Sequence, residues 1–428
     1  MNFNEKKNYL LDMIKEETVP AVGCTEPVAV ALAAAVARKY TNGDVKKIRL
    51  ITSKNIFKNG KSVMIPGTQE WGLDLAAVLG MIKGDPHKGL MVLEDVDRAS
   101  VNLSHKWIEE NHIDIDYLRE SPNIYVELHM ISDNYEVKVV IKDSHDNIDS
   151  VSLNGKLIYK EEEDITFNNE DYYNTLKAMT FKEIREIIES YTLDQVQFIE
   201  EGIYINKAAA KRGLSEESGL NIGRTLYKLQ EKGQLSKDPA TSARILTAAG
   251  SDIRMGGGLC PIMTSGGSGN QGLGVILPIA AIAEARSVDD ERTFKAVFFG
   301  HVINKYIKLY TGKLSAMCGC AIAAGVGTAA AITWMLDGDD DEIGGACDNL
   351  LSNLTGMICD GAKDTCSIKL STSAYEAIMS SYLALEGVVV NKNIGIVGNT
   401  VEDTINNVGI LAREGFAETD NVIVDIIK

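Results

Sequence analysis

The chain has 428 residues, of which 45% are hydrophobic and 24% charged, a composition typical of a globular protein with room for two or three domains. Its formal charge is −17, from 43 basic and 60 acidic residues, so we expect neither nucleic-acid binding nor attachment to an anionic membrane. The first residues lack the apolar stretch of a signal peptide, and the apolar runs are too short to span a bilayer. We therefore expect a cytoplasmic protein whose seven cysteines are reduced and serve metal binding or catalysis.

The N-terminal third mixes helical and strand patterns. Residues 5–17 predict a short amphipathic helix, and the apolar stretch Val28–Tyr40 predicts a second helix that is mostly buried. Cys24 stands just before this second helix, where the positive end of the helix dipole favours a thiolate. Val45–Ser53 alternates like a strand. The lysine-rich segment Lys54–Lys61 follows it, and we expect a solvated loop there.

The rest of the chain changes from strand to helix. Asp74–Ile82 predicts a helix, whereas the alternating segments of Ile124–Leu153 predict a meander or hairpin. Helical periodicity begins at Phe181, and further helices are expected over residues 240–249, 275–286, 289–310, 320–336, 343–354, 370–385 and 401–415. We therefore predict an α+β fold, with a mixed α/β domain over residues 1–190 and a mostly helical domain over residues 191–428. The alanine-rich helix faces are also compatible with a homo-oligomer.

A glycine-rich segment, residues 256–272, is the first candidate for a binding site. Glycines let the backbone approach a small anion closely, while serine and amide side chains supply directional hydrogen bonds. The candidate substrate-binding residues are Ser265, Gly267, Ser268, Asn270 and Gln271. The segment lacks the Gly-Lys-Ser/Thr of a nucleotide-binding P-loop, and the alternative interpretation is a flexible loop between helices. None of the six histidines lies in it, which argues against a Ser-His-Asp hydrolase or a histidine-rich zinc site.

Cysteines concentrate in two later segments, Cys318-Gly-Cys320 and Cys359-Asp-Gly-Ala-Lys-Asp-Thr-Cys366. Three thiols from two loops, beside an anion-binding segment, fit a [4Fe–4S] cluster with one iron that lacks a protein thiolate. Such an open iron can act as a Lewis acid on a substrate heteroatom. The alternative for these residues is ordinary packing, because buried free cysteines are common. Cys24 is a candidate base or conditional ligand, or else a small buried residue.

At these residues the chain resembles a known family. Gly319–Ala331 and Met357–Asp360 are similar to the cluster-binding segments of the α domain of iron–sulfur-dependent L-serine dehydratases. Thr264–Asn270 resembles the substrate loop of the same enzymes, and Ser53–Leu90 is more weakly similar to their β domain. The resemblance implies that the first predicted domain is β-domain-like and the second is α-domain-like.

The L-cysteine desulfidase branch of these proteins is the closer resemblance, through Ala21–Pro27 and Ser265–Gly272. It implies a [4Fe–4S] cofactor and a small amino-acid substrate, with L-cysteine and water converted to sulfide, ammonia and pyruvate. By residue it implies Cys320, Cys359 and Cys366 as the cluster thiolates, with Cys318 as the substitute for Cys366. Cys24 is the expected catalytic base. An active site between the two domains would bring it to the cluster.

Two other functions stay open on the sequence. L-Serine dehydration would use the same Lewis acid and the same carboxylate-binding loop, with hydroxide leaving in place of sulfide. A non-catalytic iron–sulfur sensor would need the cysteines but not the glycine-rich segment with its serine and asparagine side chains. We therefore expect a carbon–sulfur lyase, with dehydration and sensing as the alternatives.

Overall fold

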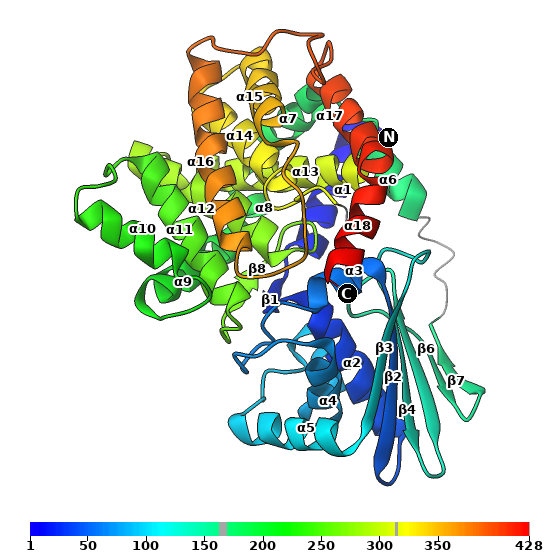
Figure 1. Ribbon diagram of the computed structural model, residues 1–428. Coiled ribbons are helices and arrows are strands. Elements are labelled where there is room, and N and C mark those ends of the chain that lie inside the picture. The colour runs from blue at the N-terminus through cyan, green and yellow to red at the C-terminus, as the bar shows by residue number, and fades with distance from the viewer. Residues whose placement is uncertain (162–168, 313–315, 428) are drawn as a thin grey trace.

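The computed structural model describes residues 1–161, 169–312 and 316–427. An N-terminal region combines a six-stranded sheet with helices, and the remainder of the chain is mostly helical (Figure 1). The predicted α+β fold class is therefore confirmed. Across the described ranges, no helix is both long enough and apolar enough to cross a membrane.

The sheet has the strand order β3-β2-β4-β5-β6-β7, and β2 and β3 run parallel whereas the other neighbours are antiparallel. Its strands are β2 (Val45–Ser53), β3 (His112–Leu118), β4 (Tyr125–Ser132), β5 (Glu136–Lys142), β6 (Ile148–Leu153) and β7 (Lys156–Lys160). Alternate residues such as Ile48, Leu50 and Leu128 are fully buried, as the period of a strand requires. They pack with α2 (Thr25–Tyr40), which in turn packs against α4 (Leu73–Lys83). The short η1 (Pro86–Met91) and α5 (Arg98–Glu110) complete this region.

The helical part is built around α13 (Asp290–Thr311) and α14 (Ala323–Met335), which are buried along most of their length. Small residues on α14 let its neighbours approach from every side, and Phe299 on α13 stacks edge-on against Trp334 on α14. The surrounding helices are α6 (Asn169–Lys177), α7 (Phe181–Glu189), α8 (Leu193–Val196), α9 (Ile199–Ser215), α10 (Ile222–Glu231), α11 (Pro239–Met255), α12 (Gly269–Arg286), α15 (Asp340–Leu354), α16 (Cys366–Leu385) and α17 (Val401–Ile410).

Each end of the chain packs against the other part of the molecule: the N-terminal helix joins the helical part, and the C-terminal helix joins the part with the sheet. α1 (Phe3–Glu17) buries Leu10 and Met13 in the helical core, where it contacts α7 and α13. At the other end, η2 (Leu411–Gly415) leads into α18 (Ala417–Ile427), which packs on α3 (Lys54–Gly60) near the sheet (Figure 1). The two parts are therefore joined at several places along the chain.

The expected solvated loop at Lys54–Lys61 is wrong, because this segment forms helix α3. The Ser53 hydroxyl caps the helix by accepting a hydrogen bond from the Ile56 N–H at 3.3 Å. Lys58 is 1% exposed and forms an ion pair with Asp420 on α18. The number of lysines suggested solvent contact, but one of them has a buried partner far along the chain.

Two helices also begin earlier than predicted, α12 at Gly269 and α16 at Cys366. Glycine lowers helix propensity, so the glycine-rich sequence does not predict the first turn of α12. A side chain at Gly272 would place its Cβ 1.9 Å from the carbonyl oxygen of Met263, so close packing explains the glycine at this position. As a result Asn270 and Cys366 lie in first helical turns, where backbone N–H groups are available to a ligand.

Candidate active site

A short strand pairing brings the start of α2 next to the glycine-rich segment. β1 (Pro20–Val22) pairs antiparallel with β8 (Pro261–Met263). The Val19 N–H also donates to Thr264 Oγ1 at 3.0 Å. Cys24 lies two residues after the end of β1, and α12 begins a few residues after β8. The first turns of α2 and α12 therefore line one cavity.

The glycine-rich segment makes a tight turn before α12. Ser265 and Ser268 exchange N–H to carbonyl hydrogen bonds of 3.1 and 3.0 Å. Between them Gly266 and Gly267 have φ values of +54° and +76°, the left-handed pair that a type I′ turn requires. Ser268 is the N-cap of α12, but its side chain makes no capping hydrogen bond, so the first-turn N–H groups are not satisfied in this way.

Ser265 lies behind the wall of the cavity and does not line it. Its hydroxyl accepts a hydrogen bond of 2.8 Å from Asn304 Nδ2 and shares a second one, also of 2.8 Å, with His301 Nδ1. Burial lowers the pKa of His301 to about 3, so the imidazole is neutral and can accept. Ser265 thus ties the turn to α13, whereas Gly267, Ser268 and the amides of α12 line the cavity.

The two cysteine segments are paired backbone to backbone. The Cys318 N–H donates to the Met357 carbonyl at 2.9 Å, and the Cys359 N–H donates to the Ala316 carbonyl at 2.6 Å. These bonds surround an isolated antiparallel bridge between Met317 and Ile358. The pairing explains how Cys318 and Cys359, which lie on segments far apart in the sequence, come to share one cavity.

Cys366 reaches the same cavity as the first residue of α16. Asp360 precedes it and forms ion pairs with Lys363 and Lys369. Burial opposes ionisation of Asp360, but these two lysines lower its pKa to about 2. Lys369 also donates to the Ile358 carbonyl at 2.8 Å, so the segment between the cysteines is held in a fixed shape.

The thiols lie close enough to influence one another's charge. A hydrogen bond from Cys320 lowers the pKa of Cys318, whereas the same bond and burial raise the pKa of Cys320. Burial also raises the pKa of Cys359, and it raises that of Cys366 to about 12. Several buried thiolates would repel one another, so this set of thiols favours a bound cation that compensates their charge.

The arrangement fits an iron–sulfur cluster better than a single ion. In the described part of the chain, no group of His, Cys, Asp or Glu side chains meets at one point as a single metal ion requires. A [4Fe–4S] cluster takes its thiolates on different irons, so its ligands surround a volume. Four free cysteines around one cavity provide that donor set, namely Cys318, Cys320, Cys359 and Cys366. Cys260 and Cys347 do not line the cavity.

Cys24 is the N-cap of α2 and packs beside Cys366. Burial raises the pKa of the Cys24 thiol, the negative charge of Glu26 raises it further, and Arg254 opposes both effects. The expectation that the helix dipole makes this thiol a thiolate is therefore wrong for this pocket. Burial also disfavours ionisation of Glu26, but His145 and the 2.9 Å hydrogen bond from Asn59 Nδ2 hold its pKa below the ordinary value.

The complete cavity has a volume of about 100 Å³ and is lined from both parts of the molecule. Sequence reasoning missed several of its residues, among them Glu26, Asn55, Asn59, His145 and Arg254. The turn between β5 and β6 supplies His145, and no local motif marks it. No local motif marks Arg254 either, because it stands near the end of α11 two residues after another charged residue, Asp252.

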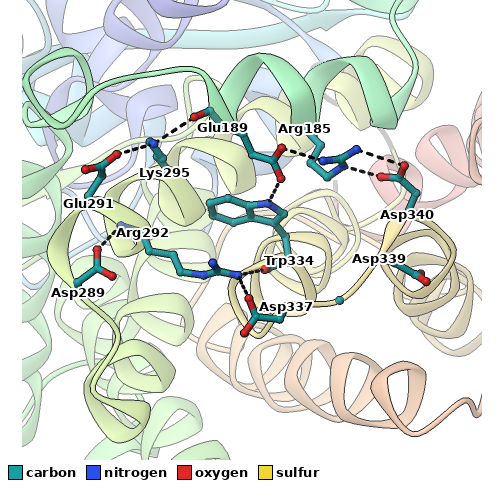
Figure 2. A pocket seen from close by; sticks show the side chains of 11 residues that line it. Arg185, Glu189, Asp289, Glu291, Arg292, Lys295, Trp334, Asp337, Asp339 and Asp340 are labelled. Atoms are coloured by element: carbon teal, nitrogen blue, oxygen red, sulfur yellow. Dashed lines mark hydrogen bonds and ion pairs between the residues drawn. The ribbon is translucent and has the colours of Figure 1, made fainter.

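A second pocket, of about 660 Å³, lies on the helical part between α7, α13 and the turn from α14 to α15 (Figure 2). Its cations already have acidic partners, in the pairs Arg185–Glu189, Arg185–Asp340, Arg292–Asp337 and Lys295–Glu291. Arg292 also donates at 2.8 Å to the Trp334 and Met335 carbonyls near the end of α14. The pocket therefore joins helices, and it contains none of the cysteine chemistry.

Comparison with known proteins agrees with the thiol-lined cavity. The family model for the serine dehydratase alpha chain matches residues 87–425. A UPF0597 protein of Clostridium botulinum (strain Okra) is 52% identical over 97% of this chain and 96% of its own length. UPF0597 proteins of Alkaliphilus oremlandii and Clostridioides difficile are 41% and 37% identical, over 99% and 98% of this chain and 99% of their own lengths. The chain therefore belongs to the serine dehydratase alpha chain family of iron–sulfur-dependent dehydratases.

Proposed function

We propose that this chain catalyses an iron–sulfur-dependent α,β-elimination on L-cysteine, giving sulfide, ammonia and pyruvate. The observation that carries the proposal is the meeting of four thiols with the uncapped first turn of α12 in one buried cavity. A family of lyases provides the reaction class. The family does not specify the leaving group, so sulfide as the leaving group is our proposal.

We assign cluster binding to Cys320, Cys359 and Cys366, with Cys318 as the substitute for Cys366. A bound [4Fe–4S] cluster with an open iron supplies a Lewis acid for the β-substituent of the substrate. Lys58 and Lys369 lower the pKa of Cys359 against the effect of burial, so the protein itself contributes positive charge beside the thiolates.

Substrate positioning falls to the start of α12. Ser268, Asn270 and Gln271 line the cavity beside backbone N–H groups of the first helical turn, a setting that suits a carboxylate. Ser265 acts from behind by holding the turn through Asn304 and His301. Because nearly all of these side chains are buried, water is largely excluded around the reacting carbon.

Removal of the α-proton is assigned to Cys24. For this role the Cys24 thiol must first lose its own proton, a step that burial and the negative charge of Glu26 oppose and that the positive charge of Arg254 favours. Loss of the α-proton and of sulfide leaves aminoacrylate. This product tautomerises to the imine, and hydrolysis with one water gives pyruvate and ammonia, so that cysteine and water balance the three products.

L-Serine dehydration is the second candidate, and the family model itself favours it. The carboxylate-binding turn and the Lewis acid serve both substrates. We place cysteine first because a sulfur leaving group prefers iron more than an oxygen leaving group does. A non-catalytic sensor is disfavoured, because it has no need of the buried turn and amides at the start of α12.

The deciding experiment is an anaerobic assay of the reconstituted protein with L-cysteine and L-serine in parallel, in which sulfide and pyruvate are measured. Sulfide and pyruvate from cysteine, lost in Cys320→Ala, would support the desulfidase assignment. Pyruvate from serine alone would establish the dehydratase. If neither product forms although the cluster is present, elimination is excluded and sensing becomes the better explanation.

A further inference from the structure

Arg254 is a buried cation that lacks a counter-ion of its own. It lies near the end of α11, lines the cavity and is 3% exposed. Its Nε has no hydrogen-bond partner, and its Nη1 approaches the Met255 sulfur at 3.3 Å. Among the described residues no carboxylate lies within ion-pair distance of it. Arg254 therefore lines the cavity without a carboxylate partner from any described segment.

A guanidinium is costly to bury unless it is paired and hydrogen-bonded. Other buried cations of this protein follow the rule, since Lys58 pairs with Asp420 and Lys305 with Glu17. Arg254 departs from this rule, and it lines the cavity that contains the thiols. An anionic ligand in the cavity would pair with the guanidinium and so remove the free-energy cost of burying its charge.

The start of α12 offers a second set of donors at the same position. A Cβ at Gly269 would lie 2.4 Å from Arg254 Nε, so the guanidinium packs directly on the first residue of this helix. The N-cap Ser268 makes no side-chain capping bond. The positive end of an 18-residue helix and a buried guanidinium therefore converge on one small volume.

We propose that Arg254 and the first turn of α12 form one carboxylate subsite, which binds the α-carboxylate of the amino-acid substrate. The proposal rests on the proposed function for the identity of that substrate. Arginine suits the role because its planar fork can donate two parallel hydrogen bonds to a carboxylate. Beside it Gln271 Oε1, which is buried and has no partner, can accept a hydrogen bond from the α-ammonium group.

A rival role for Arg254 is to neutralise the cluster thiolates. The structure favours other residues for that task, because Lys58 and Lys369 are the cations with the largest effects on Cys359. Lys369 is likewise the cation that acts on Cys318 and Cys366. The influence of Arg254 falls on Cys24 and Glu26, at the substrate side of the cavity.

The test uses L-alanine, which has the α-carboxylate and α-ammonium groups but no leaving group, and ethylamine, which lacks the carboxylate. Calorimetric titration of the anaerobically reconstituted protein should show tighter binding of L-alanine. Arg254→Gln should weaken L-alanine binding about 10- to 100-fold, the range for a lost charged hydrogen bond, and leave ethylamine unchanged. The affinity of Arg254→Lys for L-alanine should fall between those of the wild type and Arg254→Gln. The control Arg98→Gln, which changes an exposed residue, should bind L-alanine as the wild type does.

Two further measurements separate binding from structure. Because Arg254 has no counter-ion, Arg254→Gln should keep the cluster absorbance and should not lower Tm in the absence of ligand. Unchanged L-alanine binding in Arg254→Gln, or binding lost together with the cluster, would overturn the proposal. Since L-alanine cannot react, its titration stays informative even if neither cysteine nor serine is converted, so failure of the subsite and failure of the elimination are distinguishable.

Discussion

The Lys58 ammonium and the Asp420 carboxylate form a buried ion pair that joins α3 to α18 across 362 residues of sequence. The helix that it fixes also carries Asn59, whose amide donates to Glu26 in the cavity. A side chain at Gly361, between Cys359 and Cys366, would lie 2.6 Å from the Lys58 carbonyl oxygen. The last helix of the chain therefore positions one wall of the site.

Asp420→Ala should destabilise the protein by about 3–5 kcal/mol, because it leaves the Lys58 charge buried and unpaired. Urea denaturation of the anaerobic protein measures the loss. Asp133→Ala breaks the exposed pair with Lys46 and should cost less than about 1 kcal/mol. Equal effects of the two substitutions would show that the α3–α18 pair does not hold the structure.

The cluster assignment predicts different outcomes for cysteines inside and outside the cavity. Cys320→Ser and Cys359→Ser should lose most of the visible absorbance and the bound iron after anaerobic reconstitution, since thiolates are the ligands of such clusters. Cys347→Ala is the matched control, because Cys347 is fully buried but does not line the cavity. Iron content that stays at the wild-type level in both serine variants would refute a cluster at this position.

The same experiment decides between Cys318 and Cys366. Both line the cavity, but Cys318 hydrogen-bonds to the neighbouring Cys320 and enters the cavity with it, whereas Cys366 enters separately, from the start of α16. We therefore expect Cys366→Ser to lose the cluster and Cys318→Ser to retain most of its iron. The opposite order would make Cys318 the third ligand.

Local patterns predicted those parts of the fold whose cause is local. The strand Val45–Ser53 has the predicted limits because its alternation is set by one buried face. The thiols and the glycine-rich turn were identifiable because their residue types imply a chemistry. Arg254 and His145 were missed, since they act only where distant segments meet. The prediction of a loop at Lys54–Lys61 was wrong for the same reason, because the buried partner of Lys58 lies on α18.

Cys24→Ala should lower kcat about 10²- to 10⁴-fold, the usual contribution of a positioned proton-transfer group, while the cluster absorbance is retained. Steady-state sulfide or pyruvate release under anaerobic conditions measures the rate. Cys260→Ala is the control, because Cys260 is also buried but lies outside the cavity. A Cys24→Ala enzyme with wild-type kcat would exclude this residue as the base, and loss of the cluster would identify it as a ligand.

Asp348 on α15 gives a prediction for stability that is independent of the site. It is 4% exposed, and burial raises its pKa from 3.8 to about 6 although Thr404 opposes the shift. Between these values the folded protein binds more protons than the unfolded chain, so Asp348 stabilises the fold less as pH rises from about 4 to about 6. Above about pH 6 Asp348 is ionised in the folded protein, and its buried charge lowers the free energy of unfolding by a constant amount.

Asp348→Asn removes this titration and should raise the free energy of unfolding by about 1 to 2 kcal/mol at pH 8. The gain over the wild type should shrink towards zero near pH 4.5, where the native carboxyl is protonated. Urea denaturation of both proteins at the two pH values measures the difference, with the exposed Asp133→Asn as the control. A gain of the same size at both pH values would mean that packing, and not the charge of Asp348, accounts for the effect.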